Sequence, residues 1–330
     1  MSENSVSFSR ALRMAPWSLS RGVGQVMFQD NVWTGVLFMV GIIVGAYIEG
    51  MPVVALGAIV GVVTSTAAGY LFGFPDSDGN EGLWGFNGVL VGCALPTFLA
   101  NTVWMWIALI VCAAMTTWVR TGMNNLLAPW RVSSFTFPFV FCTWCFLLAG
   151  REFLGMAATH MSAPAIDYTI APVVCHNVVD FAEYWLKGVA QVFLIDSWLT
   201  GIIFLVALAV ASWRAALWAA ISSAVALCMA LLWEAQGSSI IGGLYGFSAV
   251  LTGIALGATF WKPTLRNSIM ALFGVVATVF IQAAMNAMMA PLGLASLTAP
   301  FCIGTWLFML PLLEPKISQS DNKISQSDKK

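Results

Sequence analysis

Charged residues are scarce in this chain, at 9% of its 330 residues, and only 14 residues are basic. With a net charge of −1, the chain lacks the basic surface that a phosphate backbone requires, and this excludes nucleic-acid binding. Apolar residues make up 59% of the chain, and its mean hydropathy is +0.85. Because so little polar surface could not cover a soluble globule, the composition predicts an integral membrane protein.

Metal-ligating and catalytic side chains are scarce as well. Six of the seven cysteines lie in apolar segments, and the pair Cys142 and Cys145 has neither a second pair nor nearby histidines. The two histidines, His160 and His176, share one linker, and no string of intramembrane carboxylates or histidines marks a proton relay. No nucleophile with a base and no phosphate-binding loop is evident. The sequence therefore predicts no metal site, no disulfide, no cofactor and no enzymatic activity.

What the chain does contain is one pattern that occurs twice. Three blocks return in the same order, at offsets of 161 to 166 residues: 22–26 as 188–192, 83–92 as 244–253, and 133–139 as 295–301. Three ordered blocks at nearly one spacing indicate a duplication. In duplicated membrane proteins the substrate site lies where the halves meet, so residues that pair across the copies are the first functional candidates.

Ten apolar stretches are about long enough to cross a bilayer, five in each copy. They fall roughly at 33–49, 52–72, 83–98, 101–119 and 135–152, and again at 199–213, 215–233, 244–260, 268–289 and 297–313. A shorter apolar segment precedes each set, at 13–30 and 180–197, and is interpreted as a re-entrant half-helix. Because each copy has an odd number of spans, the second copy enters the membrane from the opposite face.

The expected fold is therefore an all-α membrane protein with ten transmembrane helices and two re-entrant half-helices, arranged as two inverted five-helix repeats around a central pore. It divides into an N-terminal cytoplasmic tail, a first repeat, an external linker, a second repeat and a disordered cytoplasmic tail, at 1–12, 13–152, 153–179, 180–313 and 314–330. The linker holds both histidines, for which the sequence favours a structural role.

The basic residues support this topology. With the N-terminus inside, the basic residues of both tails and those at Arg120, Arg214 and Lys262 fall on the cytoplasmic side, as the positive-inside rule requires. Only Arg151 and Lys187 fall outside. The chain is therefore predicted to be a multi-pass protein of the inner, cytoplasmic membrane, with both termini in the cytoplasm.

Two phenylalanines occupy matching places in the duplicated blocks. Phe86 and Phe247 each follow a glycine, which lets backbones approach closely inside a membrane. Two rings related in this way could face each other and form a flat apolar slot. Leu90 and Leu251, four residues on, would lie on the same helical face and extend the slot. The alternative is that each side chain packs in the core or faces lipid.

Polar side chains recur beside these rings. Gln25 and Gln191 stand in the half-helices, where a buried amide must find a partner or face a wet cavity. They could offer acceptor oxygens to a solute carrying NH2 groups, or they could tie off a helix end. Thr136 and Thr298 precede a proline by two residues, and their hydroxyls could satisfy a freed carbonyl or bind a passing solute.

Asp30 and Asp196 follow the two glutamines by five residues and precede the first spanning helix of each copy. Each is followed by a second residue able to cap a helix, Asn31 or Ser197. The aspartates are interpreted as the helix N-caps.

Together, these paired motifs resemble the urea transporters of bacteria and animal kidney. The resemblance runs from Gly22 to Leu313 and is specific, because three motifs agree in order, spacing and duplication. The family signature is written LPxxTxPF, and serine or alanine replaces its proline here. Its remaining part is retained in both copies, as Thr136, Pro138 and Phe139 and as Thr298, Pro300 and Phe301.

The resemblance implies a homotrimer in the lipid bilayer, with a separate pore in every subunit that conducts urea passively. It also implies amide side chains at the two filter ends, stacking rings between them and threonines at the centre. Phe28 would add a further apolar wall, and its repeat partner is Leu194, so the second end is expected to be wider or less aromatic. The predicted pore lining is Gln25, Phe28, Phe86, Leu90, Thr136, Gln191, Val192, Phe247, Leu251 and Thr298.

Urea suits such a slot on physical grounds, because it is planar, neutral and rich in NH2 donors. Hydrated ions would lose their water there without compensation. The sequence leaves alternatives open: a pore for another small neutral solute, such as a short amide, ammonia or water, or an ion-coupled transporter.

Overall fold

The computed structural model describes residues 16–165, 169–173, 175 and 177–312. The predicted tails 1–12 and 314–330, and His176, lie outside the described residues. Within them, regular structure is helical, apart from two isolated β-bridges. The prediction of an all-α protein is confirmed.

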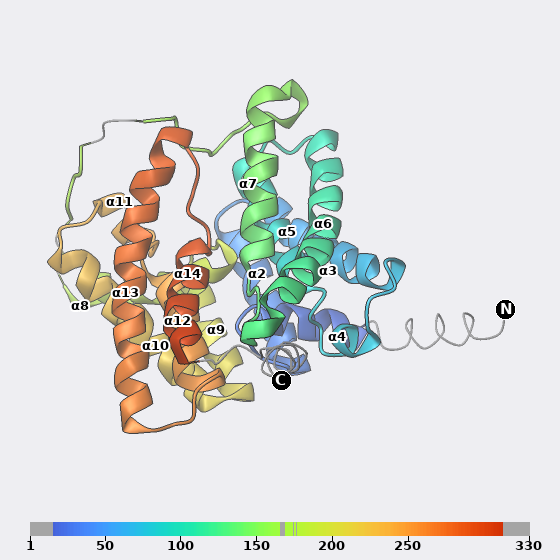
Figure 1. Ribbon diagram of the computed structural model, residues 1–330. Coiled ribbons are helices and arrows are strands. Elements are labelled where there is room, and N and C mark those ends of the chain that lie inside the picture. The colour runs from blue at the N-terminus through green and yellow to red at the C-terminus, as the bar shows by residue number, and fades with distance from the viewer. Residues whose placement is uncertain (1–15, 166–168, 174, 176, 313–330) are drawn as a thin grey trace, which may run out of the picture.

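The first half of the chain (blue to green in Figure 1) begins with a helix over residues 16–25. It continues with α2 (Val32–Ile48), α3 (Pro52–Leu71), α4 (Asp76–Asn80), α5 (Phe86–Phe98), α6 (Val103–Leu127), the 3-10 turn η1 (Ala128–Trp130), α7 (Phe137–Glu152) and η2 (Leu154–Met156). Helix α6 passes the predicted end of its span at 119 by eight residues, so Arg120 lies inside a helix and not in a loop.

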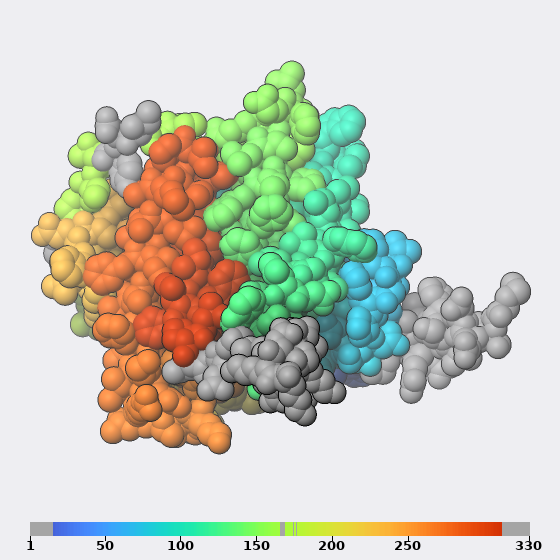
Figure 2. Space-filling model, viewed as in Figure 1, coloured from blue at the N-terminus to red at the C-terminus, as the bar shows by residue number. Residues whose placement is uncertain are grey.

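The second half (yellow to red in Figure 1) repeats this order. Its elements are α8 (Val178–Ala190), η3 (Gln191–Phe193), α9 (Trp198–Ala211), α10 (Trp213–Leu232), α11 (Gly237–Ile241), α12 (Gly246–Ile254), the π-helical turn η4 (Ala255–Thr259), α13 (Leu265–Met289), η5 (Ala290–Leu292), α14 (Ala299–Met309) and η6 (Leu310–Leu312). Each long helix of one half thus has a counterpart in the other. Figure 2 shows one face of the seam, where α13 and α14 meet green atoms of the first half.

Backbone strain recurs at matching positions. Phe28 and Leu194 both adopt the left-handed conformation, with φ of 63° and 59°, where each half-helix ends. Phe135 and Leu297 do the same before α7 and α14, with φ of 51° and 50°. A side chain in this conformation costs about 1–2 kcal/mol. The same cost at the same places indicates that both halves follow one backbone plan.

Two helices of the same rank, α2 and α9, pack against each other across the halves. The hydroxyl of Thr34 donates to the carbonyl of Ala207 at 2.8 Å. The hydroxyl of Thr200, its repeat partner, donates to the carbonyl of Gly41 at 3.1 Å. The donors and the acceptors are each 166 positions apart, so the two bonds are reciprocal. Reciprocal contacts of this kind are what a two-fold axis produces.

A second reciprocal pair joins the ends of the chain halves at α7 and α14. The indole Nε1 of Trp144 donates to the carbonyl of Ala295 at 2.9 Å. The indole of Trp306 donates to the carbonyl of Ser133, also at 2.9 Å. Both partners are again separated by one repeat, 162 positions. Each tryptophan therefore bonds its half to the other half through an equivalent hydrogen bond.

Four helices among the described residues are each long and apolar enough to cross a membrane: α3, α6, α10 and α13, with the turns that extend α6 and α13 included. Residues 178–193 and helix α9 form a further bent pair, broken by 70°. Helices α2, α5, α12 and α14 are apolar but shorter. The chain is thus an integral membrane protein, as its composition predicts.

The predicted helix caps are displaced by one residue. Asn31, not Asp30, caps α2, because its side chain accepts from the N–H of Thr34. Ser197 likewise caps α9. The aspartates instead form ion pairs with the half-helices, Asp30 with Arg21 and Asp196 with Lys187. The interpretation of the aspartates as caps was wrong: the helices begin at Val32 and Trp198, so Asn31 and Ser197 occupy the cap positions and supply the acceptor oxygens.

The repeated glycines allow the two half-helices to pack closely on α5 and α12, which carry the predicted slot residues and are called the slot helices below. A Cβ built on Gly22 would lie 3.1 Å from the Cα of Gly85, and one on Gly246 would lie 2.5 Å from the Cα of Gly188. These pairs occupy equivalent places in the two halves. The glycines therefore allow the close approach that the sequence predicted for them.

Candidate functional site

The two predicted threonines meet where the halves meet. The hydroxyl oxygens of Thr136 and Thr298 lie 2.6 Å apart, and both residues are buried. Each threonine is the N-cap residue of its helix, α7 or α14, so two helix N-termini converge on this point. The hydroxyls bond to each other, and not to carbonyls freed by the prolines. They form a polar contact at the centre of the molecule.

The predicted slot residues lie in the first turns of α5 and α12. Phe86 and Phe247 are nearly buried, with 6% and 8% of their surface exposed. Leu90 and Leu251, one turn further on, are fully buried, and so is Val192.

Helix α5, which carries Phe86, is bonded to α7, the helix whose N-cap is Thr136. The side-chain oxygen of Asn87 accepts from the backbone N–H of Phe139, near the start of α7, at 3.1 Å. In the second half the residue equivalent to Asn87 is Ser248, whose hydroxyl is buried without a partner in the described structure. The two slot helices are therefore held differently.

The two glutamines are held in the same way in both halves. The NH2 group of Gln25 donates to the carbonyl of Glu81 at 3.0 Å, and that of Gln191 donates to the carbonyl of Gly242 at 2.8 Å. Glu81 and Gly242 are the C-cap residues of α4 and α11. Each amide thus satisfies a helix end, and its donor side is occupied. No residue in the described ranges donates to either Oε1, so the acceptor side remains available.

A cavity of about 880 Å³ opens on the Gln191 side of the molecule. Four of the predicted residues line it: Gln191, Val192, Phe247 and Thr298. It therefore reaches the central threonine contact. The other predicted residues do not belong to its lining: Gln25, Phe28, Phe86, Leu90, Thr136 and Leu251.

Part of the cavity wall is polar. Gln282 donates to Asn286 at 3.0 Å, and the hydroxyl of Ser296 donates to the same Asn286 oxygen at 2.8 Å. Glu49 and Asp196 also line the cavity. The amides of this wall and the hydroxyl of Thr298, which also lines the cavity, offer hydrogen bonds to a neutral polar solute.

Glu49 stands in the turn between α2 and α3. Burial raises the pKa of Glu49 to about 7. A hydrogen bond from the backbone of Asp196 opposes this shift, the negative charge of Asp196 adds to it, and Lys187 opposes it. The cavity therefore has one carboxyl group that titrates near neutral pH.

At the end of the predicted pore lining that carries Phe28, aromatic rings pack together. The ring of Phe28 meets those of Phe135, Phe260 and Phe301 edge-on, with centroid distances of 6.1, 5.5 and 5.9 Å. Phe135 also contacts Phe260 and Phe301, at 5.7 and 5.4 Å. We call these four residues the aromatic cluster. Sequence reasoning found only Phe28, although Phe135 and Phe301 stand in the duplicated block.

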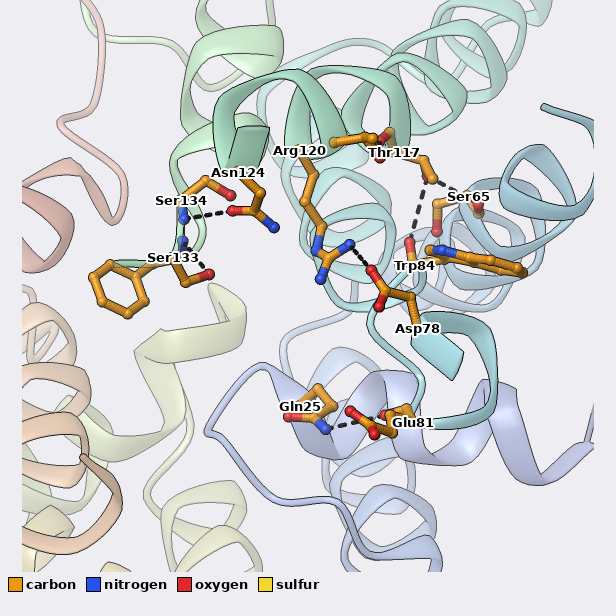
Figure 3. Close-up of polar contacts among 12 residues, drawn as sticks. Gln25, Ser65, Asp78, Glu81, Trp84, Thr117, Arg120, Asn124, Ser133 and Ser134 are labelled. Atoms are coloured by element: carbon orange, nitrogen blue, oxygen red, sulfur yellow. Dashed lines mark hydrogen bonds and ion pairs between the residues drawn. The ribbon is translucent and has the colours of Figure 1, made fainter. Parts of the chain in front are cut away.

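A charged pair lies beside this end (Figure 3). Arg120 of α6 points toward α4, and its Nη1 lies 2.8 Å from the Oδ2 of Asp78. Gln25 and Glu81 form their bond below this pair in the same view. The guanidinium carbon of Arg120 also lies 5.9 Å from the ring centroid of Phe86. Sequence reasoning missed this pair, because a basic residue just beyond an apolar stretch was interpreted as a cytoplasmic one.

Comparison with known proteins places this geometry in a family. Residues 17–312 match the family model described as "Urea transporter". The chain is 31% identical over 304 residues to a protein named Urea transporter 1 in Ovis aries, which covers 91% of this chain and 78% of the relative. Urea transporter 1 of Capra hircus is 30% identical with the same coverage, and that of Rattus norvegicus is 29% identical over 302 residues, covering 91% and 77%. The matched range includes every predicted pathway residue.

Proposed function

Because this chain belongs to the urea transporter family, it is a passive urea transporter and not an enzyme, and we propose that urea crosses it along the path between its two halves. The observation that carries the proposed path is the contact of Thr136 with Thr298. It joins the two halves, and Thr298 lines the cavity of about 880 Å³.

Urea fits the groups along this path. Its NH2 groups find acceptors in the Oε1 atoms of Gln25 and Gln191, which are left free because each amide nitrogen binds a carbonyl. Its flat faces stack on Phe86 and Phe247. At the centre, the threonine hydroxyls part from each other and bond the solute in place of water. A dehydrated ion would find no such compensation.

The proposed topology has ten transmembrane helices in two inverted repeats. The reciprocal bonds of Thr34 with Thr200 and of Trp144 with Trp306 support a two-fold relation between the halves. The bend of 70° between residues 178–193 and α9 supports a re-entrant half-helix at the start of the second repeat. In this arrangement both termini are cytoplasmic, and the linker 153–179 is external.

The protein is proposed to act as a homotrimer in the inner membrane, with one pathway in each subunit. Large apolar side chains exposed on α3, α6 and α10 support contacts with lipid or with neighbouring subunits. Single-subunit pathways mean that trimer formation is not needed to complete the site.

Stopped-flow urea flux in proteoliposomes tests this function. The purified protein should pass urea down its gradient, and the flux should persist when proton and sodium gradients are collapsed. Loss of uptake on addition of an uncoupler alone would refute the passive mechanism. Ammonia and water flux, measured in the same vesicles, should stay at the level of protein-free vesicles if urea is the preferred solute.

A further inference from the structure

The proposed urea path makes no use of one buried charge, that of Arg120. Only 6% of this residue is exposed, and its Nε has no partner in the described structure, although Nη1 is bonded to Asp78. A charged side chain is costly inside a membrane protein and marks a functional role by default. The position of the guanidinium therefore needs an explanation.

One predicted wall of the path, the ring of Phe86, lies close to Arg120. A distance of 5.9 Å from the guanidinium carbon to the ring centroid is within the range of cation–π attraction. The negative face of an aromatic ring attracts cations, and a ring that already holds a cation at one face attracts a second one less. Arg120 thus weakens the attraction of the Phe86 ring for a second cation.

The second half has no charge in the equivalent place. The residue 162 positions after Arg120 is Gln282, a neutral amide that bonds to Asn286 and Ser296 in the cavity wall. The backbone plan of the fold does not require a cation at this point, because the other half does without one. The charge belongs to one end of the path only.

We propose that Arg120 is a specificity-determining residue that excludes planar cations of the guanidinium type while uncharged urea passes. This rests on the proposed function, because it takes Phe86 as a wall of the urea path. Guanidinium is as flat as urea and presents NH2 groups to the same glutamine oxygens, so shape and hydrogen bonding do not separate the two solutes. A fixed positive charge 5.9 Å from the ring of Phe86 does separate them.

Other charges near this end do not cancel the effect. Arg21 and Asp30 pair with each other at 3.2 Å and are partly exposed. Asp78 offsets part of the charge of Arg120, but its carboxylate binds the guanidinium at Nη1 and is itself partly exposed to solvent. Water screens an exposed charge more than a buried one. The buried guanidinium is therefore screened less than its counter-ion.

The test compares guanidinium and urea permeability in proteoliposomes for the wild type, Arg120→Gln and Asp78→Asn. Valinomycin, with equal potassium on both sides, holds the membrane potential near zero. Arg120→Gln copies the amide of the second half and should raise the guanidinium-to-urea ratio about tenfold. Asp78→Asn removes the opposing charge and should leave the ratio unchanged or lower it.

The two variants separate an electrostatic role from a structural one. If the ion pair only braces α4 against α6, both substitutions break the same brace and shift the ratio in the same direction. An equal rise in both variants, or an unchanged ratio in an assembled Arg120→Gln protein, overturns the proposal. Asp78→Asn decides the question alone if Arg120→Gln fails to assemble, because a raised ratio in Asp78→Asn also overturns it.

Arg120→Lys provides the matched control, since it keeps the charge and loses the planar group. Its ratio should stay near that of the wild type, and a rise like that of Arg120→Gln contradicts the proposal. Urea flux of the wild type is measured first. A wild type that passes no urea refutes the proposed function, whereas one that passes urea beside an unchanged Arg120→Gln refutes only the role of Arg120.

Discussion

The two ends of the proposed path differ although the backbones that form them match. At the first end, Phe28 and Phe135 stand in left-handed positions and carry the aromatic cluster. At the second end, Leu194 and Leu297 occupy the same positions, and the cavity of about 880 Å³ opens there. The backbone of the proposed path is thus the same at both ends. The difference lies in the side chains at two positions, which are phenylalanines at the end filled by rings and leucines at the end with the cavity.

The centre, which both ends share, should be the most sensitive point. Thr136→Val with Thr298→Val removes both hydroxyls and keeps the side-chain shape. A dehydrated urea then lacks a partner there, at a cost of about 1–3 kcal/mol, so flux should fall about 5- to 150-fold. Replacing both partners of a hydrogen bond by apolar groups is nearly neutral for stability. The melting temperature should therefore change little, and a normal flux in the double variant would show that the path bypasses the threonines.

Exchanging the left-handed side chains should convert one end toward the other. Phe28→Leu opens the aromatic cluster, so methylurea and thiourea should gain on urea by about 1 kcal/mol, roughly fivefold in relative flux. Leu194→Phe should act in the opposite direction by narrowing the second end. Both are measured as flux ratios in proteoliposomes. Equal ratios in the two variants would mean that the narrowest part of the path lies elsewhere.

The glutamines should respond alike at both ends. Gln25→Leu and Gln191→Leu each remove an acceptor worth about 0.5–1.5 kcal/mol, so the urea concentration for half-maximal flux should rise about two- to tenfold. Gln29→Leu is the matched control, because Gln29 is buried and donates to the carbonyl of Met27 at 2.7 Å. If the path variants behave like this control, with a lower melting temperature and the wild-type urea dependence, the glutamines only cap α4 and α11.

Glu49 should give the smallest effect, and only at the second end. The pKa of the Glu49 carboxyl is about 7 in the folded protein, above its ordinary value of 4.5. The folded state therefore binds the proton more tightly than the unfolded state does. The stabilisation is complete below pH 4.5 and is lost as the pH rises through 7. Glu49→Gln should flatten the dependence of melting temperature on pH in this window. A slope identical to that of the wild type would exclude Glu49 as its source.

The correspondence between the two halves was predictable from the sequence, because the repeated blocks contain similar residues in the same order. The blocks around Phe86, Thr136 and their copies predicted which elements correspond and which side chains pair. The loss of one ring between Phe28 and Leu194 also predicted a less aromatic second end. Each of these features lies within a few neighbouring residues, and each position occurs once in every copy of the repeat.

Contacts between distant segments were not predictable in this way. Phe260 joins the aromatic cluster from the end of the second slot helix, and nothing near it in sequence indicates that neighbour. The ion pair of Arg120 with Asp78 joins residues 42 positions apart. Asp30 was misread as a cap because its cation, Arg21, lies across the half-helix turn. Which partner each of these side chains contacts depends on the residues that the fold places next to it.

The reciprocal bonds between the halves have a consequence for how such a duplicated chain can diverge. All four acceptors are main-chain carbonyls, those of Gly41, Ala207, Ser133 and Ala295. A carbonyl is present whatever side chain the residue carries, so the bonds do not depend on the acceptor side chains. Gly41 is still restricted, because a Cβ there would lie 2.6 Å from the ring of Phe204. Apart from Gly41, the bonds require only the donor threonines and tryptophans. The two copies could therefore come to differ at their ends while these bonds were kept. One end is filled by aromatic rings, and the other opens to a cavity lined by Glu49 and Asp196.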